Sequence, residues 1–148
     1  MKKYRCLCGS GKQTISRFLS LPREIYDKDT LPQDYKTEKE ILNRSHVLSS
    51  TFQIYPFVVV GDNGRTYCRC LLTYYLNDPV AYLGFFEAHN NKTAVREMFM
   101  QVERKVRYDG KTKIVGPIDA SIYINYRFKA NKVDYKALPY RLHQIYLL

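Results

Sequence analysis

Residues 80–117 decide the fold, and they read VAYLGFFEAHNNKTAVREMFMQVERKVRYDGKTKIVGP. An apolar, aromatic-rich run predicts a β-strand over residues 80–88, and a polar loop follows it. The next segment predicts an amphipathic helix, because apolar side chains recur at spacings of three and four: Val95, Met98, Phe99, Val102 and Val106. Gly110 suits the end of this helix, and residues 113–115 predict a short buried strand. The stretch therefore predicts a strand–loop–helix–strand unit.

The loop inside this unit indicates a binding site. It opens onto a helix N-terminus, where the first backbone N–H groups have no partner within the helix and point outward. Such an end favours an anion, of which a phosphate group is the common example. We therefore expect a place for a phosphorylated ligand at the segment His89-Asn90-Asn91-Lys92-Thr93-Ala94.

A β-hairpin is the clearest feature in the middle of the chain. Residues 52–60 are rich in β-branched and aromatic side chains, residues 65–76 alternate as a strand does, and residues 61–64 (GDNG) form a strong turn signal. Residues 2–8 predict a short first strand. With two helices before the hairpin, this order predicts an α/β (α+β) fold: a mixed, mostly antiparallel sheet with helices on its faces.

The two helices before the hairpin have separate start signals. Thr14 is the predicted N-cap of the first helix. Pro22 is predicted to interrupt this helix and to start a second helical turn, since proline fits the first helical position. Thr37 and Glu40 have the spacing of a capping box and predict the start of the next helix.

Composition limits the class of protein. The 148 residues fit a single domain, residues 1–148, with room for a core. The net charge of +10 raises the local concentration of anionic partners. No apolar run is long enough for a membrane span, and no apolar segment of a secretory signal follows the basic start. We therefore expect a cytoplasmic protein without a membrane partner, whose four cysteines are thiols.

Two Cys-x-Cys pairs have three readings. Residues two apart in a strand share a face, so Cys6 with Cys8 and Cys68 with Cys70 could supply thiolates for zinc, form disulfides, or serve as small buried hydrophobes. Structural zinc sites usually place two or more residues between ligands, which favours buried thiols here. The histidines stand apart from one another in the sequence, and no metal site is predicted.

Several motifs together resemble the GNAT superfamily of N-acetyltransferases, and in particular a bacterial GNAT-like family. They are FLSLPREIY at residues 18–26, the hairpin turn, GFFE at residues 84–87, and GPIDAS at residues 116–121. The resemblance covers residues 14–133. It implies a GNAT-like fold in which the strand over residues 80–88 splays away from the strand over residues 113–115.

The resemblance also implies an activity and its residues. It implies transfer of an acetyl or acyl group from acetyl-CoA, or another acyl-CoA, to an unidentified amine. The pantetheine arm would lie beside the backbone of four residues: Gly84, Phe85, Phe86 and Glu87. The pyrophosphate would meet five others: Asn90, Asn91, Lys92, Thr93 and Ala94. For proton transfer, the resemblance makes Glu87 the candidate general base and Tyr126 a candidate general acid.

Two departures from the GNAT pattern open other readings. GNAT loops commonly carry glycines, whereas residues 89–94 contain none. The family also continues with two more strands, but few residues follow Val133. The chain is therefore either a truncated or divergent member that lacks the C-terminal strands, or one whose sheet edge another copy completes in a homo-oligomer. The alternative function is a catalytically inactive GNAT-like fold that acts as an oligomeric or partner-binding module.

A third function, nucleic-acid binding, rests on the charge of the chain alone. Four basic residues lie on the exposed side of the long predicted helix: Arg96, Arg104, Lys105 and Arg107. Glu97 and Glu103 are interleaved with them, a pattern that favours an ordinary solvated helix face over a nucleic-acid interface.

Overall fold

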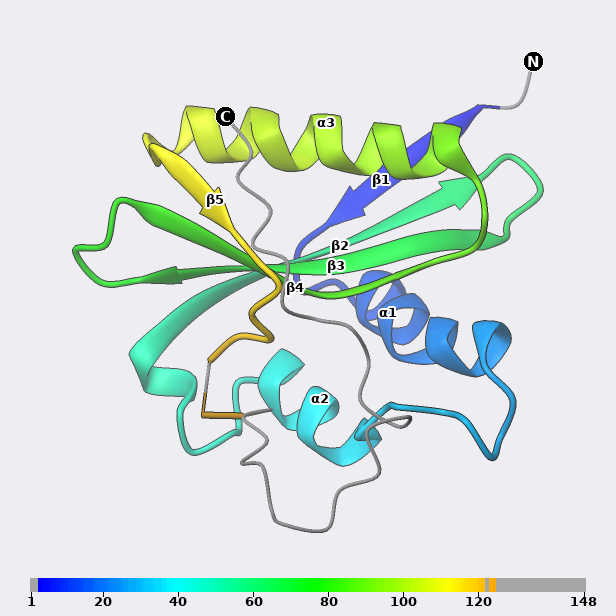
Figure 1. The fold of residues 1–148 in the computed structure, drawn as a ribbon, viewed down its shortest axis with the longest axis horizontal. Helices are drawn as coiled ribbons and strands as arrows, with labels where there is room; N and C mark the ends of the chain where they lie inside the picture. The colour runs from blue at the N-terminus through cyan, green and yellow to red at the C-terminus, as the bar shows by residue number, and fades with distance from the viewer. Residues whose placement is uncertain (1–2, 122, 125–148) are drawn as a thin grey trace, which may run out of the picture.

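The computed structural model describes residues 3–121, 123 and 124, which form a mixed sheet with helices on both faces (Figure 1). The strands lie in sequence order in the sheet: β1 (Tyr4–Cys8), β2 (Phe52–Gly61), β3 (Thr66–Tyr75), β4 (Val80–Ala88) and β5 (Lys113–Val115). Neighbouring strands from β1 to β4 pair antiparallel, whereas β5 runs parallel to β4. The predicted fold class, a mixed and mostly antiparallel α/β sheet, is confirmed.

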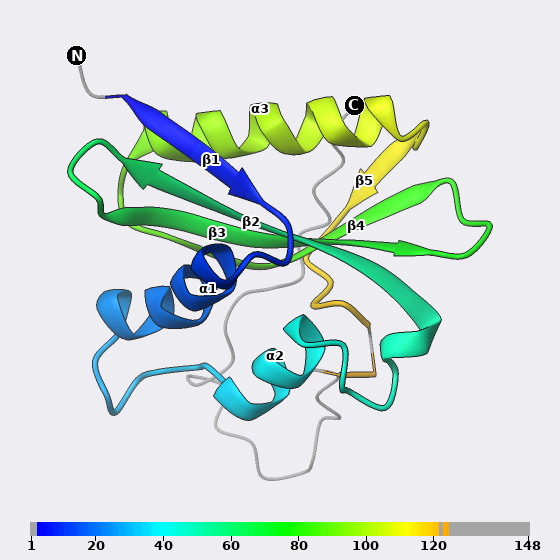
Figure 2. The same cartoon turned by 180° about the vertical axis from the view of Figure 1, so that it is seen from behind.

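Helices cover the two faces of the sheet unequally. Figures 1 and 2 show α3 (Lys92–Tyr108) lying across one face, with α1 (Lys12–Ile25) and α2 (Tyr35–Leu42) on the opposite face. A short 3-10 turn, η1 (Ser49–Thr51), leads into β2. In the part of the chain that the structure describes, no helix is long and apolar enough to cross a membrane.

Helix α3 packs along the stripe that its sequence predicts. Met98, Val102 and Val106 are fully buried, and Val95 and Phe99 lie half-buried beside them. Their partners are side chains of the sheet: Phe57, Val59, Cys68, Cys70, Leu72, Ala81, Leu83 and Ile114. Each fully buried aliphatic side chain contributes about 1.5–3 kcal/mol to stability. This burial holds α3, and the loop before it, against one face of the sheet.

Helix α1 differs from the prediction in two ways. It begins at Lys12, so Thr14 lies within its first turn and does not cap it. It also runs through Pro22 without a break. A proline inside a helix leaves the carbonyl four residues earlier without its donor, and here that carbonyl, Phe18 O, accepts a hydrogen bond from Arg69 Nη1 at 2.8 Å. The interruption predicted at Pro22 is wrong because a distant side chain replaces the lost helical bond.

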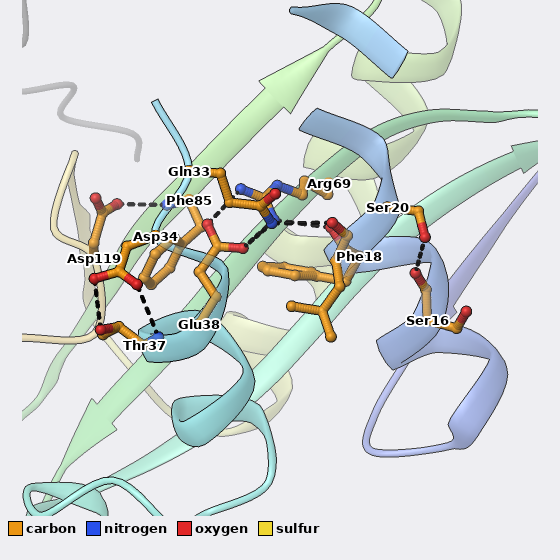
Figure 3. Close-up of polar contacts among 11 residues, drawn as sticks. Ser16, Phe18, Ser20, Gln33, Asp34, Thr37, Glu38, Arg69, Phe85 and Asp119 are labelled. Carbon is orange, nitrogen blue, oxygen red and sulfur yellow. Dashed lines mark hydrogen bonds and ion pairs between the residues drawn. The ribbon is translucent and has the colours of Figure 1, made fainter. Parts of the chain in front are cut away.

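Arg69 joins three elements at the centre of this face (Figure 3). Its side chain is only 2% exposed, and its two terminal nitrogens donate to both carboxylate oxygens of Glu38 in α2, at 2.8 and 2.9 Å. Gln33 Nε2 donates to the same carboxylate and to Leu19 O of α1. The guanidinium also lies over the Phe18 ring, 4.4 Å from its centroid. The ion pair is therefore buried, bidentate and supported by further hydrogen bonds.

The start of α2 lies earlier than the predicted capping box. Asp34 is the N-cap, and its Oδ1 accepts a hydrogen bond from Thr37 N at 3.1 Å. The Thr37 hydroxyl donates to Asp34 Oδ2 at 2.7 Å, and this bond is the main cause that lowers the pKa of the Asp34 carboxyl. The capping role predicted for Thr37 with Glu40 is therefore wrong, because an aspartate three residues earlier serves that end of the helix.

Removing one member of the buried ion pair should destabilise the fold strongly. We expect Glu38→Ala to lower the free energy of unfolding by about 3–5 kcal/mol, since it leaves the Arg69 charge buried without its partner. Urea denaturation measures this loss. The matched control is Glu40→Ala in the same helix, expected to change stability by about 0.5 kcal/mol or less. Equal losses from the two variants would show that the pair does not organise this face.

Candidate functional site

Strand β4 carries a bulge near its end. Leu71 of β3 pairs with Gly84, whereas Arg69, two residues earlier in β3, pairs with Glu87. β4 therefore uses one residue more than β3 over this stretch, and Phe85 takes a φ of 49°. A bulge of this kind re-aims side chains and bends the strand, and bulges are frequent beside active sites.

The bulge decides which face each following side chain meets. Phe85 joins the core on the α1 side and packs edge-on against Phe18, with ring centroids 6.3 Å apart. Phe86 stacks on Phe99 of α3 at 5.7 Å and remains 40% exposed. The Glu87 side chain lies on the same face of the sheet as α1, beside the C-terminal end of that helix. Three consecutive residues of β4 are thus divided between the two faces of the sheet.

The segment after β5 occupies the edge of β4 at the bulge. Ile118 N donates to Leu83 O at 2.9 Å. Phe85 N donates to Asp119 Oδ1 at 2.6 Å, a contact drawn in Figure 3. Two backbone groups of β4 that could otherwise receive an extended ligand therefore already have partners within the chain.

Glycines allow this close approach of two backbones. A Cβ on Gly84 would lie 2.1 Å from the carbonyl oxygen of Ile118, and a Cβ on Gly116 would lie 2.5 Å from a carbonyl oxygen of β4. Neither position has room for a side chain. The hydroxyl of Tyr75 donates to Ala120 O at 2.5 Å and holds the far end of the segment.

A buried carboxylate lies beyond the bulge. Glu87 is 7% exposed, and its Oε2 accepts a hydrogen bond from the hydroxyl of Tyr26, the C-cap residue of α1, at 2.5 Å. His89 follows just after β4, and its Nε2 lies 3.8 Å from the Glu24 carboxylate, an ion pair when the imidazole is protonated. The ends of β4 and α1 therefore bring ionisable side chains together, including the predicted base.

The N-terminus of α3 is capped by its own sequence. Asn91 Oδ1 accepts a hydrogen bond from Ala94 N at 3.0 Å, and Asn91 Nδ2 donates to the Tyr4 hydroxyl at 2.8 Å. The φ of Asn91 is −141°, so the asparagine serves as a cap and not as a left-handed turn residue. Lys92 and Thr93 are exposed in the first turn. An anion here would meet their amides, whereas the Ala94 amide already has an acceptor.

The remaining predicted site residues make no described contact with the bulge of β4. Asn90 is exposed in the loop before α3. Tyr126, the predicted general acid, lies outside the described residues. Of the four basic residues considered for nucleic-acid binding, Arg107 pairs with Glu103 and Lys105 pairs with Asp109.

The cysteine pairs do not form a metal centre in the described structure. The four cysteines are free thiols: Cys6, Cys8, Cys68 and Cys70. Within residues 3–121, 123 and 124, no group of three or more histidine, cysteine or acidic side chains is placed to hold a metal ion. Burial is the main cause that raises the pKa of Cys6 and of Cys68 to about 12, and burial also raises the pKa of Cys70.

Solved structures share this arrangement at low sequence identity. A tandem GNAT protein from the clavulanic acid biosynthesis pathway, solved without AcCoA, matches 80% of this chain with a TM-score of 0.58 and 14% identity. The chain spans 37% of that protein. An acetyltransferase of the GNAT family from Staphylococcus aureus Mu50 has a TM-score of 0.56 and 13% sequence identity to this chain. The match covers 97% of this chain and 94% of the acetyltransferase chain. The chain has the GNAT fold.

A third structure agrees with this assignment of the fold. A proposed N-acetyltransferase from Lactobacillus plantarum matches 98% of this chain and 99% of its own, with a TM-score of 0.56 and 14% identity. No family profile and no curated protein sequence matches the chain. The GNAT fold predicted from the motifs is thus confirmed by shape, and the roles of individual residues remain predictions.

Sequence reasoning did not single out two residues that contact β4 at the bulge. Tyr26 belongs to the motif FLSLPREIY and Asp119 to the motif GPIDAS, but neither was assigned a role in a site. They reach Glu87 and Phe85 across sequence separations of 61 and 34 residues. No local periodicity in the sequence marks Tyr26 or Asp119 as a site residue. Their place in the two family motifs was the one signal that could have indicated a role for them.

The buried thiols predict how stability depends on pH. A thiol whose pKa rises on folding stabilises the protein fully below the unfolded pKa, and this stabilisation is lost as the pH rises through the folded pKa. For Cys68 that window runs from 9.0 to about 12. In alkaline urea denaturation, Cys68→Val should flatten the fall in unfolding free energy by up to about 1.4 kcal/mol per pH unit. Parallel curves for the variant and the parent would contradict the burial of this thiol.

Proposed function

We propose that the protein is a cytoplasmic GNAT-like N-acyltransferase domain that transfers an acetyl or acyl group from acyl-CoA to an amine. The observation that carries the proposal is the bulge in β4, after which the buried Glu87 lies near the end of the strand, two residues before the loop that leads into α3. The GNAT fold found in the solved structures supports it. The free thiols agree with a reducing cytoplasm.

The donor would bind along β4 and at the start of α3. In this proposal the pantetheine arm meets the backbone of residues 84–87, and the pyrophosphate meets the loop and the amides of Lys92 and Thr93. Asp119 holds the Phe85 amide, so its carboxylate must move for a donor carbonyl to bind that amide. A charge-assisted hydrogen bond contributes about 1.5–3 kcal/mol, so this contact opposes donor binding by a similar amount.

The acceptor would be a small amine that reaches Glu87. Its nitrogen attacks the thioester carbonyl, the C–N bond forms, the C–S bond breaks, and the proton lost by the amine passes to the Glu87 carboxylate. The Tyr26 hydroxyl, bonded to Oε2, would orient this carboxylate. The proposed donor of a proton to the leaving thiolate is Tyr126. Direct attack of this kind needs no covalent enzyme intermediate.

A second candidate is a catalytically inactive GNAT-like module that binds a partner or forms a homo-oligomer. The specific observation in its favour is the occupied edge of β4, where residues 116–120 lie against the backbone beside Gly84. In this case the contacts of Asp119 and Tyr75 are permanent parts of the fold. Donor binding therefore separates the two candidates.

Calorimetric titration with acetyl-CoA tests the donor site. We expect the parent chain to bind, and Asp119→Ala to bind about tenfold or more tightly, because the variant frees the Phe85 amide. The matched control is Asp62→Ala in the exposed hairpin turn, expected to bind like the parent. If neither the parent nor Asp119→Ala takes up acetyl-CoA at millimolar concentration, the acyltransferase proposal fails and the inactive module is favoured.

Steady-state kinetics with an amine panel tests the base. Glu87→Gln should lower kcat by about 10²–10⁴-fold, because a general base contributes by that factor, and should leave the KM for acyl-CoA unchanged. Glu103→Gln on the exposed face of α3 is the control for the same change of charge. A Glu87→Gln variant with parental kcat would exclude Glu87 as the base.

A further inference from the structure

Among the described residues, strand β1 leaves one edge of the sheet open. It lies at the end of the strand order and, among the described strands, pairs with β2 alone. On the β2 side, Lys3 O accepts from Asp62 N, and Gly9 N donates to Pro56 O. Backbone groups alternate along a strand, so the odd-numbered residues of β1 face β2 and the even-numbered ones face outward. The amides and carbonyls of the even-numbered residues Cys6 and Cys8 are therefore directed away from β2.

A groove lies beside this open edge, between β1 and the C-terminal half of α3. Its volume is about 340 Å³. It is lined by seven residues: Cys6, Cys8, Phe57, Gln101, Arg104, Lys105 and Tyr108. The same two cysteines thus offer backbone groups at the edge and side chains in the groove. A segment that paired with β1 would place every second side chain over the groove, because side chains alternate between the two faces of a strand.

The charges around the groove favour an acidic occupant. Arg104 is exposed and forms no ion pair with any residue in the described part of the chain. Two carboxylates near the C-terminal end of α3 are already engaged, since Glu103 pairs with Arg107 and Asp109 pairs with Lys105. The whole chain carries a net charge of +10. Among the residues that the structure describes, none that lines the groove is acidic.

We propose that the open edge of β1 and this groove bind an extended, acidic segment of a partner protein as a sixth strand. Backbone hydrogen bonds to Cys6 and Cys8 would hold the segment, an apolar side chain would enter the groove, and a carboxylate would meet Arg104. A second copy of this chain fits poorly, because antiparallel pairing of two β1 edges brings two unpaired Arg104 side chains and two net charges of +10 together. The surface lies apart from the bulge of β4, so the proposal does not depend on acyl transfer.

Fluorescence anisotropy with synthetic peptides tests the strand pairing. The probe is the labelled heptapeptide Thr-Glu-Thr-Val-Thr-Glu-Thr, in which the valine and both glutamates share one face of the strand, and the charge control replaces both glutamates by lysine. Two further peptides carry N-methyl groups on alternate residues, one on the four threonines and one on the other three residues. We expect the acidic peptide to bind, the basic peptide not to bind, and only one of the two methylated peptides to lose binding, since alternate amides face the partner strand.

Variants of the protein test the surface itself. Cys8→Pro removes an outward amide without removing a bond to β2, and should abolish peptide binding, whereas Cys8→Val keeps the amide and should bind like the parent. Arg104→Glu should weaken binding of the acidic peptide about tenfold or more, because it places a like charge beside the peptide carboxylates. Arg96→Glu, in the other half of α3, is the control for the same charge change. Thermal unfolding confirms that each variant is folded.

Three outcomes would overturn the proposal. The acidic and basic peptides could bind equally, both methylated peptides could retain binding, or Arg104→Glu and Arg96→Glu could have the same effect. Light scattering adds a fourth: a parent chain that is dimeric, and becomes monomeric in Cys8→Pro, would assign the edge to a second copy. Loss of acetyl-CoA binding in the earlier experiment would leave this proposal untouched.

Discussion

The buried charge of Arg69 is the constraint on which the rest of the structure depends. A guanidinium this deep in the fold is tolerated only with a close counter-charge and hydrogen bonds, and Glu38, Gln33 and the Phe18 carbonyl supply them. These partners come from α1, α2 and the loop between them, so both helices must sit over β3. Because Arg69 also serves the carbonyl freed by the proline in α1, that helix continues to its end and delivers Tyr26 to Glu87.

The bulge in β4 links this framework to the candidate site. It turns Phe85 toward the core under α1 and leaves its amide at the strand edge, where Asp119 accepts its hydrogen bond. The same backbone edge would serve an acyl donor in an enzyme and is a permanent contact in an inactive module. The two proposed functions therefore differ in whether residues 116–120, which bond to Leu83 and Phe85, can leave the edge of β4.

Local signals in the sequence were enough for much of the fold. The hairpin, β4, α3 and β5 follow from apolar periodicity and turn residues, and these act between near neighbours. The interruption at Pro22 was wrong because the helical bond that proline removes was replaced from β3, 47 residues beyond it in the chain. The helix starts at Thr14 and Thr37 were misplaced because Gly11 begins α1 without a side-chain cap and Asp34 caps α2.

In the candidate site, too, local sequence patterns predicted some features, and only the tertiary structure revealed the others. The sequence by itself determined the element order, the stripe of α3, the Glu87 carboxylate at a strand end and the polar loop before a helix, because each is written in neighbouring residues. Only the tertiary structure decided that Tyr26 meets Glu87, that Asp119 occupies the edge of β4, and that β1 leaves an open edge beside a groove. Those contacts join residues far apart in the chain, and their geometry depends on sheet register, a bulge and one buried ion pair, which no local pattern encodes.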